Sequence, residues 1–130
     1  MNQSAQKFWR EGGCHCGKVR FKVRSTFESA LLCNCSICQR TGFVHLIVEK
    51  EDFQLLSGEQ NLENYQFGSQ IAKHLFCRSC GVKSYYVPRS HPDSYSVNLR
   101  CVENLDLGSI NIIPFDGQNW NANIDKIRPV

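Results

Sequence analysis

The chain has 130 residues, a length that fits one domain with a hydrophobic core of its own. Its composition is ordinary for a globular protein, and no apolar run approaches the roughly 18 residues that span a bilayer. The formal net charge of +3 is small for a strong non-specific nucleic-acid binder. We therefore expect one domain that has no membrane segment and does not bind nucleic acid strongly. The charge does not predict whether the protein forms an oligomer.

The first ten residues are polar apart from a Phe-Trp pair, and they lack the apolar stretch of a secretory signal. We interpret residues 1–10 as a flexible N-terminal segment and residues 11–125 as the domain. The lack of a signal predicts a cytoplasmic protein, with the nucleus as a second location. Thiols stay reduced in these compartments, so the cysteines are better interpreted as metal ligands than as a disulfide framework.

The hydrophobic pattern predicts strands and little helix. Residues 18–24 alternate basic and apolar side chains, a period of two that gives a strand one buried and one solvated face. Further strands are expected at 30–33, 44–48, 64–67, 71–76, 83–87, 95–99 and 110–115, separated by turn residues. Helical turns are expected only at 36–41, 49–53 and 120–127. The predicted class is therefore all-β.

Seven of the eight cysteines fall into three clusters, which are Cys14 with Cys16, then Cys33, Cys35 and Cys38, then Cys77 with Cys80. Thiolates one or two residues apart can bind one ion through bonds of about 2.3 Å, as zinc requires. Two closed tetrahedral sites would need about eight ligands, so seven cysteines leave one site a ligand short. A zinc ion with a vacant position can take part in catalysis.

Spacing alone leaves two ways of dividing these cysteines. In one, Cys14, Cys16, Cys77 and Cys80 form the closed site, and Cys33, Cys35 and Cys38 form the open one. In the other, the two CxxC pairs (Cys35, Cys38, Cys77 and Cys80) form a zinc-ribbon quartet, and Cys14, Cys16 and Cys33 remain. Both schemes fit the geometry that zinc requires.

The three motifs, in residues 12–21, 33–38 and 76–81, resemble the glutathione-dependent formaldehyde-activating enzyme family, which includes centromere protein V. The similarity runs in order from about residue 11 to residue 120, and residues 86–92 look closer to the centromere protein V branch. The resemblance implies a β-tent of twisted antiparallel sheets stapled by zinc. It also implies the first division, with one structural zinc and a labile catalytic zinc at Cys33, Cys35 and Cys38.

The resemblance further implies an activity. The resemblance implies addition of the glutathione thiolate to formaldehyde, giving S-(hydroxymethyl)glutathione, which is a carbon–sulfur lyase type of reaction. We therefore predict a zinc-dependent enzyme that acts on glutathione or a similar small thiol. The alternative is a non-catalytic zinc-binding interaction module of the centromere protein V kind. A chaperone-like partner of small GTPases is a third possibility, but it would be expected to hold only one metal.

Candidate substrate contacts lie outside the cysteine clusters. Arg89 and Ser90 follow a predicted strand and could bind a substrate carboxylate, and His91 is a candidate general base. Arg40 could offset the negative charge of the nearby thiolates.

Several other polar and sulfur-containing residues are assigned no site. His15, His45 and His74 are interpreted as packed or surface side chains. Cys101 is expected to be a free, partly buried thiol. The basic stripe within residues 18–24 is expected to be a solvated strand face.

Overall fold

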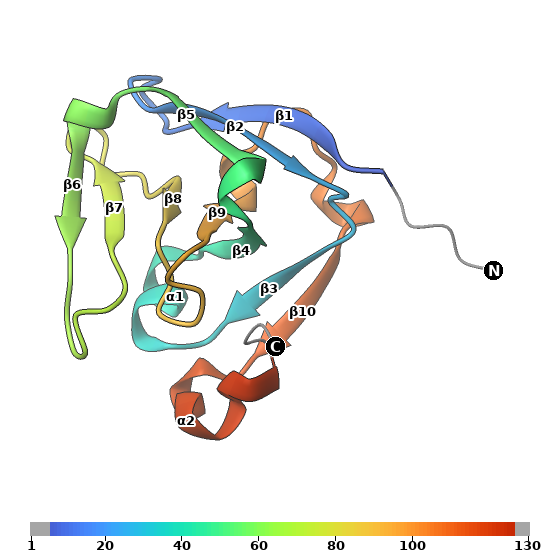
Figure 1. Cartoon of the computed structure of the whole chain (residues 1–130), viewed down its shortest axis with the longest axis vertical. Helices are drawn as coiled ribbons and strands as arrows, with labels where there is room; N and C mark the ends of the chain where they lie inside the picture. Colours follow the sequence, from blue (N-terminus) through green and yellow to red (C-terminus); the bar gives the residue numbers. More distant parts are fainter. Residues whose placement is uncertain (1–5, 127–130) are drawn as a thin grey trace.

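The computed structural model describes residues 6–126, and β-strands dominate it (Figure 1). The strands are β1 (Phe8–Gly13), β2 (Arg20–Ser25), β3 (Ser29–Cys33), β4 (Val44–Val48), β5 (Phe53–Ser57), β6 (Leu62–Tyr65), β7 (His74–Cys77), β8 (Tyr85–Tyr86), β9 (Tyr95–Asn98) and β10 (Asn111–Phe115). The α-helices are α1 (Ser36–Thr41) and α2 (Trp120–Asn123). The remaining helical turns are of the 3-10 type, at Lys50–Asp52, Glu59–Asn61, Leu99–Cys101, Leu107–Ser109, Gly117–Asn119 and Ile124–Lys126. The predicted all-β class is confirmed.

The strands form three sheets. One has the order β1-β2-β5, one has the order β10-β3-β4-β9-β8, and the hairpin β6-β7 makes the third. Figure 1 shows the β1-β2-β5 sheet across the top of the molecule and the β6-β7 hairpin at its left side. All strand pairs are antiparallel except β3 with β10, which run parallel. In the described part of the chain, no helix is long and apolar enough to cross a membrane.

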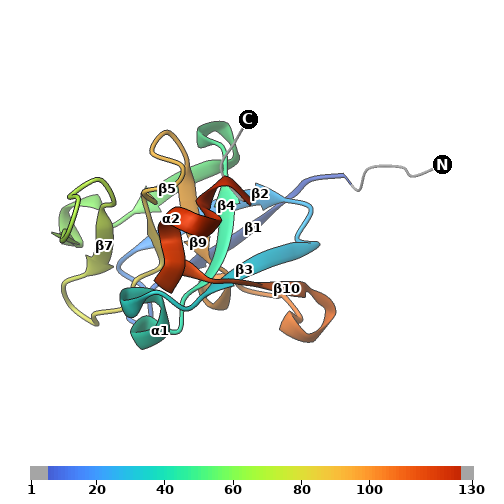
Figure 2. The same cartoon turned by 90° about the horizontal axis from the view of Figure 1, so that it is seen from below.

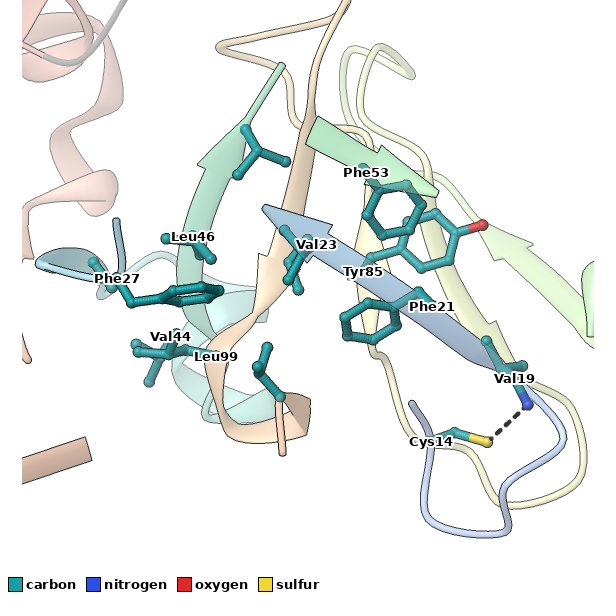
Figure 3. Close-up of a cluster of buried hydrophobic side chains, with 14 of the residues drawn as sticks. Cys14, Val19, Phe21, Val23, Phe27, Val44, Leu46, Phe53, Tyr85 and Leu99 are labelled. Carbon is teal, nitrogen blue, oxygen red and sulfur yellow. Dashed lines mark hydrogen bonds between the residues drawn. The ribbon is translucent and has the colours of Figure 1, made fainter. Parts of the chain in front are cut away.

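The core lies between the β1-β2-β5 sheet and the five-stranded sheet (Figure 3). Val19, Phe21 and Val23 are fully buried, which confirms the predicted two-residue period of this segment. The ring of Phe21 stacks on that of Phe53 at a centroid distance of 5.6 Å, and Phe53 packs on Tyr85 at 4.6 Å. These aromatic contacts join two of the three sheets into one core.

Two strands were not predicted, namely β1 and β5. Strand β1 begins at Phe8, three residues before the predicted start of the domain, and residues 1–5 lie outside the described residues. Most side chains of β1 are exposed or half-buried, and it is held by backbone pairing with β2. In addition, Lys22 and Arg24 lie over the ring of Trp9, at 4.7 and 5.0 Å from its centroid. A strand held mainly by its neighbour leaves little hydrophobic pattern in its own sequence.

All the predicted strands exist; β4 has the predicted bounds, and the ends of the others are shifted. Strand β6 begins two residues before the predicted 64–67 segment, β7 begins three residues later than predicted, and β8 spans only Tyr85–Tyr86. The predicted helical turns at 36–41 and 49–53 are matched by α1 and by Lys50–Asp52. The predicted C-terminal helix is divided into α2 and the turn Ile124–Lys126, and Ile127 lies outside the described residues.

The parallel pairing of β3 with β10 brings the C-terminal part of the chain to the central cysteines. Phe115 pairs with Cys33 at the end of both strands, and the amide of Asn34 donates to the carbonyl of Phe115 at 3.2 Å. The side chain of Asn34 donates to Asp116 at 3.1 Å and accepts from the amide of Gln118 at 3.0 Å. Figure 2 shows β10 lying along β3 and leading towards α2.

Candidate metal centre and cavity

The ligand atoms of Cys14, Cys16, Cys77 and Cys80 all lie within 4.8 Å of one another. The sulfur of Cys16 lies 3.6 Å from that of Cys14 and 3.7 Å from that of Cys77. A tetrahedral ion with zinc–sulfur bonds of about 2.3 Å places its sulfurs about 3.8 Å apart. The four thiols therefore fit a closed zinc site, and each sulfur is a donor that zinc prefers.

Tight turns shape this four-cysteine group. Gly17 and Gly81, which follow the two motifs, have φ angles of +84° and +78°, a conformation that glycine adopts without strain. The amide of Gly81 donates to the carbonyl of Cys77 at 2.7 Å, which closes the second turn. The sulfur of Cys14 accepts from the amide of Val19 at 3.3 Å, so the group is tied directly to the core (Figure 3).

The ligand atoms of Cys33, Cys35 and Cys38 also lie within 4.8 Å of one another, and we call these three residues the cysteine trio. Cys33 ends β3, Cys35 is the N-cap of α1, and Cys38 lies one turn into that helix. The three sulfurs could hold an ion and leave one tetrahedral position open. Among the described residues, the structure forms this group and the four-cysteine group, so it does not form the zinc-ribbon quartet.

The three thiols of the trio have different proton affinities. Hydrogen bonds from the thiols of Cys33 and Cys38 lower the pKa of Cys35, and the backbone amides of Cys38 and Ile37 support its thiolate. The same interactions raise the pKa of Cys38, whose side chain is buried. None of the eight cysteines forms a disulfide, including the half-buried Cys101.

A polar chain leads from the trio into the core. The Nε2 atom of His45 lies 3.1 Å from the sulfur of Cys38. Its Nδ1 atom lies 3.0 Å from the hydroxyl of Ser96 and 3.1 Å from that of Tyr86. All four side chains are buried. Burial, and then the charge of Lys83, lower the pKa of His45 to about 3, so the imidazole is neutral at pH 7.

A buried lysine lies behind this chain. The Nζ atom of Lys83 is 2.6 Å from Nδ1 of His74, and it lies over the ring of Tyr86 at 3.9 Å and that of Phe43 at 5.1 Å. No ion pair of Lys83 with a carboxylate occurs within residues 6–126. Burial lowers the pKa of Lys83 to about 8, although the nearby thiols Cys38 and Cys35 oppose that shift.

The trio opens into a cavity of about 460 Å³. Its walls are largely apolar and aromatic, with side chains that include Leu31, Ile47, Phe67, Tyr86, Phe115 and Trp120. Cavities of this size and character hold small molecules in many proteins. The cavity lies directly against sulfurs that could hold an ion, which makes it the candidate substrate site.

The predicted substrate contacts are only partly brought to this cavity. Arg89 and Ser90 line it, and the hydroxyl of Ser90 lies 2.7 Å from Nδ1 of His91. Arg40 is exposed and is not among the described residues that line the cavity. Its guanidinium donates to the carbonyl of Ser36, one helical turn earlier, at 3.0 Å. His15 is exposed and belongs to neither sulfur group in the described part of the chain.

A glycine closes one side of the trio. A Cβ atom built on Gly117 would lie 2.4 Å from the sulfur of Cys33 and 3.1 Å from Cβ of Cys35. Side chains do not approach this closely, so only glycine fits here without a shift of the trio. Its place is fixed by the contacts of Asn34 with Asp116 and Gln118 on either side of it.

The sequence model of the family described as "Glutathione-dependent formaldehyde-activating enzyme" matches residues 9–113. The chain belongs to this family. The chain is also similar to a protein from Rhodobacter sphaeroides whose crystal structure is known, with 37% sequence identity and a TM-score of 0.73. The match covers 80% of this chain and 97% of that one. The predicted resemblance is therefore confirmed, and all seven clustered cysteines lie within the matched range.

The cysteine clusters were predicted from the sequence, but much of their surroundings was not. His45 was interpreted as a packed histidine; it is buried, but it also contacts a sulfur of the trio. The position of His45 within an apolar strand indicated that its side chain points inward. The pattern could not show that it contacts Cys38. Gly117 and Trp120 lie beyond the matched range, and no motif marks them.

Proposed function

We propose that the protein is a zinc-dependent enzyme of the carbon–sulfur lyase type that joins a small thiol to an aldehyde, with glutathione and formaldehyde as the model pair. In this proposal, Cys14, Cys16, Cys77 and Cys80 hold a structural zinc ion, and Cys33, Cys35 and Cys38 hold a catalytic one. The observation that carries the proposal is the cysteine trio at the wall of the 460 Å³ cavity. Membership of the family supports the same chemistry.

The reaction forms one carbon–sulfur bond. The thiol sulfur attacks the aldehyde carbon, the carbonyl π electrons move to oxygen, and the thiol proton ends on that oxygen, so a hydroxymethyl thioether forms without loss of atoms. When bound, zinc supplies an open coordination position for a thiol and lowers its pKa. The reverse reaction is the lyase direction.

The residues of the chain have separate roles in this proposal. The trio holds the ion, and the buried contact of His45 with Cys38 orients one of its sulfurs. The largely apolar walls of the cavity exclude water from the reacting atoms. Ser90 lines the cavity and its hydroxyl contacts His91, so this pair could carry the proton between sulfur and oxygen. Arg89 is the candidate contact for a substrate carboxylate.

The test compares the wild-type protein with Cys35→Ser and with Cys101→Ser, and all three proteins are prepared with zinc. Formation of S-(hydroxymethyl)glutathione from glutathione and formaldehyde is followed by NMR exchange between the free and adduct signals. We expect enhanced exchange in the wild type and in Cys101→Ser, and only the uncatalysed rate in a folded Cys35→Ser protein. Equal exchange with and without the wild-type protein, over a range of thiols, would favour the non-catalytic zinc module.

A further inference from the structure

One side chain supplies the fixed positive charge of the candidate substrate cavity. Among the described residues that line it, Arg89 is the only lysine or arginine, and no aspartate or glutamate is present. The other lining residues are apolar, aromatic or uncharged, apart from the trio and the histidines. A ligand that lies with its sulfur near the trio therefore meets one fixed positive charge and no fixed carboxylate.

Arg89 is held by an aromatic face. The centre of its guanidinium lies 3.7 Å from the centroid of the Trp120 ring. Arg89 is exposed, and within residues 6–126 it makes no ion pair with a carboxylate. A stacked guanidinium uses its face for the ring, and its N–H groups remain in the plane, where they can bind a carboxylate through two hydrogen bonds.

Trp120 is itself fixed relative to the trio. It is the first residue of α2 and follows the segment in which Gly117 covers the sulfur of Cys33. Asn119 donates to Asp116 at 2.8 Å, and Asp116 accepts from Asn34 at 3.1 Å. The same loop therefore connects the aromatic support of Arg89 to the metal-binding cysteines. This segment lies beyond residues 9–113, the range that the family model matches.

We propose that Trp120 is a positioning residue that acts through Arg89, and that together they select thiols bearing a carboxylate. This inference rests on the proposed function because it places the substrate sulfur at the trio. A free arginine side chain loses rotamer freedom when it binds a ligand, and this loss opposes binding. Because Arg89 is already ordered by stacking on Trp120, its side chain loses less freedom when the ligand binds. The segment from Asp116 to Trp120 thus contributes to the selection of the thiol substrate.

The test measures binding, so that it does not depend on turnover. Calorimetry with the zinc-loaded protein compares S-methylglutathione, which cannot react at sulfur, with its dimethyl ester, which lacks both carboxylates. For the wild type we expect the free acid to bind about tenfold more tightly than the ester, as one charge-assisted bidentate contact would give. Arg89→Ala should abolish this preference, and Trp120→Ala should reduce it about threefold to fivefold. Trp120→Phe, which keeps an aromatic face, should retain most of it.

Trp9→Ala is the matched control, because Trp9 also lies beneath cations but on the β1-β2-β5 sheet. It should leave the preference unchanged. The inference is overturned if the wild type binds acid and ester equally, or if Trp120→Ala keeps the full preference. If the preference is found but no thiol addition is catalysed, the proposed function fails and the binding role of Arg89 and Trp120 stands. If thiol addition is catalysed equally well with the esterified thiol, the inference fails and the proposed function stands.

Discussion

The Nε2 atom of His45 lies 3.1 Å from the sulfur of Cys38, the buried member of the trio. When Cys38 is a thiolate, it can only accept a hydrogen bond, so the hydrogen of the neutral imidazole must be on Nε2. Its Nδ1 atom then accepts from the hydroxyl of Ser96 or Tyr86, both of which are within 3.1 Å. The core strands β4 and β9 thereby orient one sulfur of the candidate metal site.

We predict that His45→Leu weakens zinc binding at the trio by about 10- to 100-fold, the usual effect of losing a hydrogen-bond partner of a metal ligand. Competition with a chromophoric chelator measures this affinity. Ser96→Ala, which leaves the Nε2 contact intact, should weaken binding by a smaller factor. Wild-type zinc affinity in His45→Leu would show that the hydrogen bond to Cys38 does not support the metal.

We predict that Gly117→Ala disturbs the trio but spares the four-cysteine group, because the new Cβ would lie 2.4 Å from the sulfur of Cys33. The variant should lose one zinc per chain on dialysis and keep the other, as measured by atomic absorption. In the control Gly108→Ala, the nearest atom to the new Cβ is a side-chain oxygen at 3.3 Å, so full zinc content is expected. Retention of both ions by Gly117→Ala would contradict the close packing on Cys33.

The two cysteine groups should contribute differently to the free energy of unfolding. Cys16→Ser removes a ligand from the group that ties residues near the start of the chain to Cys77 and Cys80, and it should lower the free energy of unfolding by at least about 3 kcal/mol. Cys35→Ser should change it by less than about 1 kcal/mol, because the trio borders a cavity. Urea unfolding of the zinc-loaded proteins measures both. A larger loss in Cys35→Ser than in Cys16→Ser would reverse the proposed roles.

Lys83 should give stability a distinct pH dependence. Burial lowers its pKa in the folded protein from 10.5 to about 8, so between these values the unfolded chain binds more protons than the native one. The unfolding free energy of the wild type should therefore rise relative to Lys83→Met as pH increases from about 8 to 10.5, and the difference should be constant below pH 8. Urea unfolding of both proteins across this range tests it. Parallel curves throughout would mean that Lys83 is not desolvated.

Much of the chemistry could be predicted from the sequence because the cysteines interact with close neighbours in the chain. The turns at Gly17 and Gly81 and the helical turn after Cys35 are local, so the clusters were visible in the sequence. Their grouping was not, because it depends on which distant segments the sheets bring together. The resemblance to the family supplied that grouping, and the structure forms the same two groups.

The surroundings of the trio could not be predicted, because they too depend on which distant segments the sheets bring together. His45 and Ser96 are 51 positions apart and meet only through the pairing of β4 with β9. Gly117 reaches Cys33 because β10 runs parallel to β3, and a parallel pair depends on a long connection that no local pattern encodes. Arg40 shows the limit of closeness in sequence, since it lies two residues after Cys38 but is not among the described residues that line the cavity, and its guanidinium donates to the carbonyl of Ser36.

The central claim is that the chain holds two zinc ions of unequal accessibility, one closed by four thiols and one open at the trio. Zinc per chain, measured before and after brief treatment with a mild chelator, tests it most directly. The account predicts two ions at the start and rapid loss of one, with slower loss when glutathione is present and a single inert ion in Cys35→Ser. A wild-type protein that binds only one zinc, or two that resist the chelator equally, would contradict it.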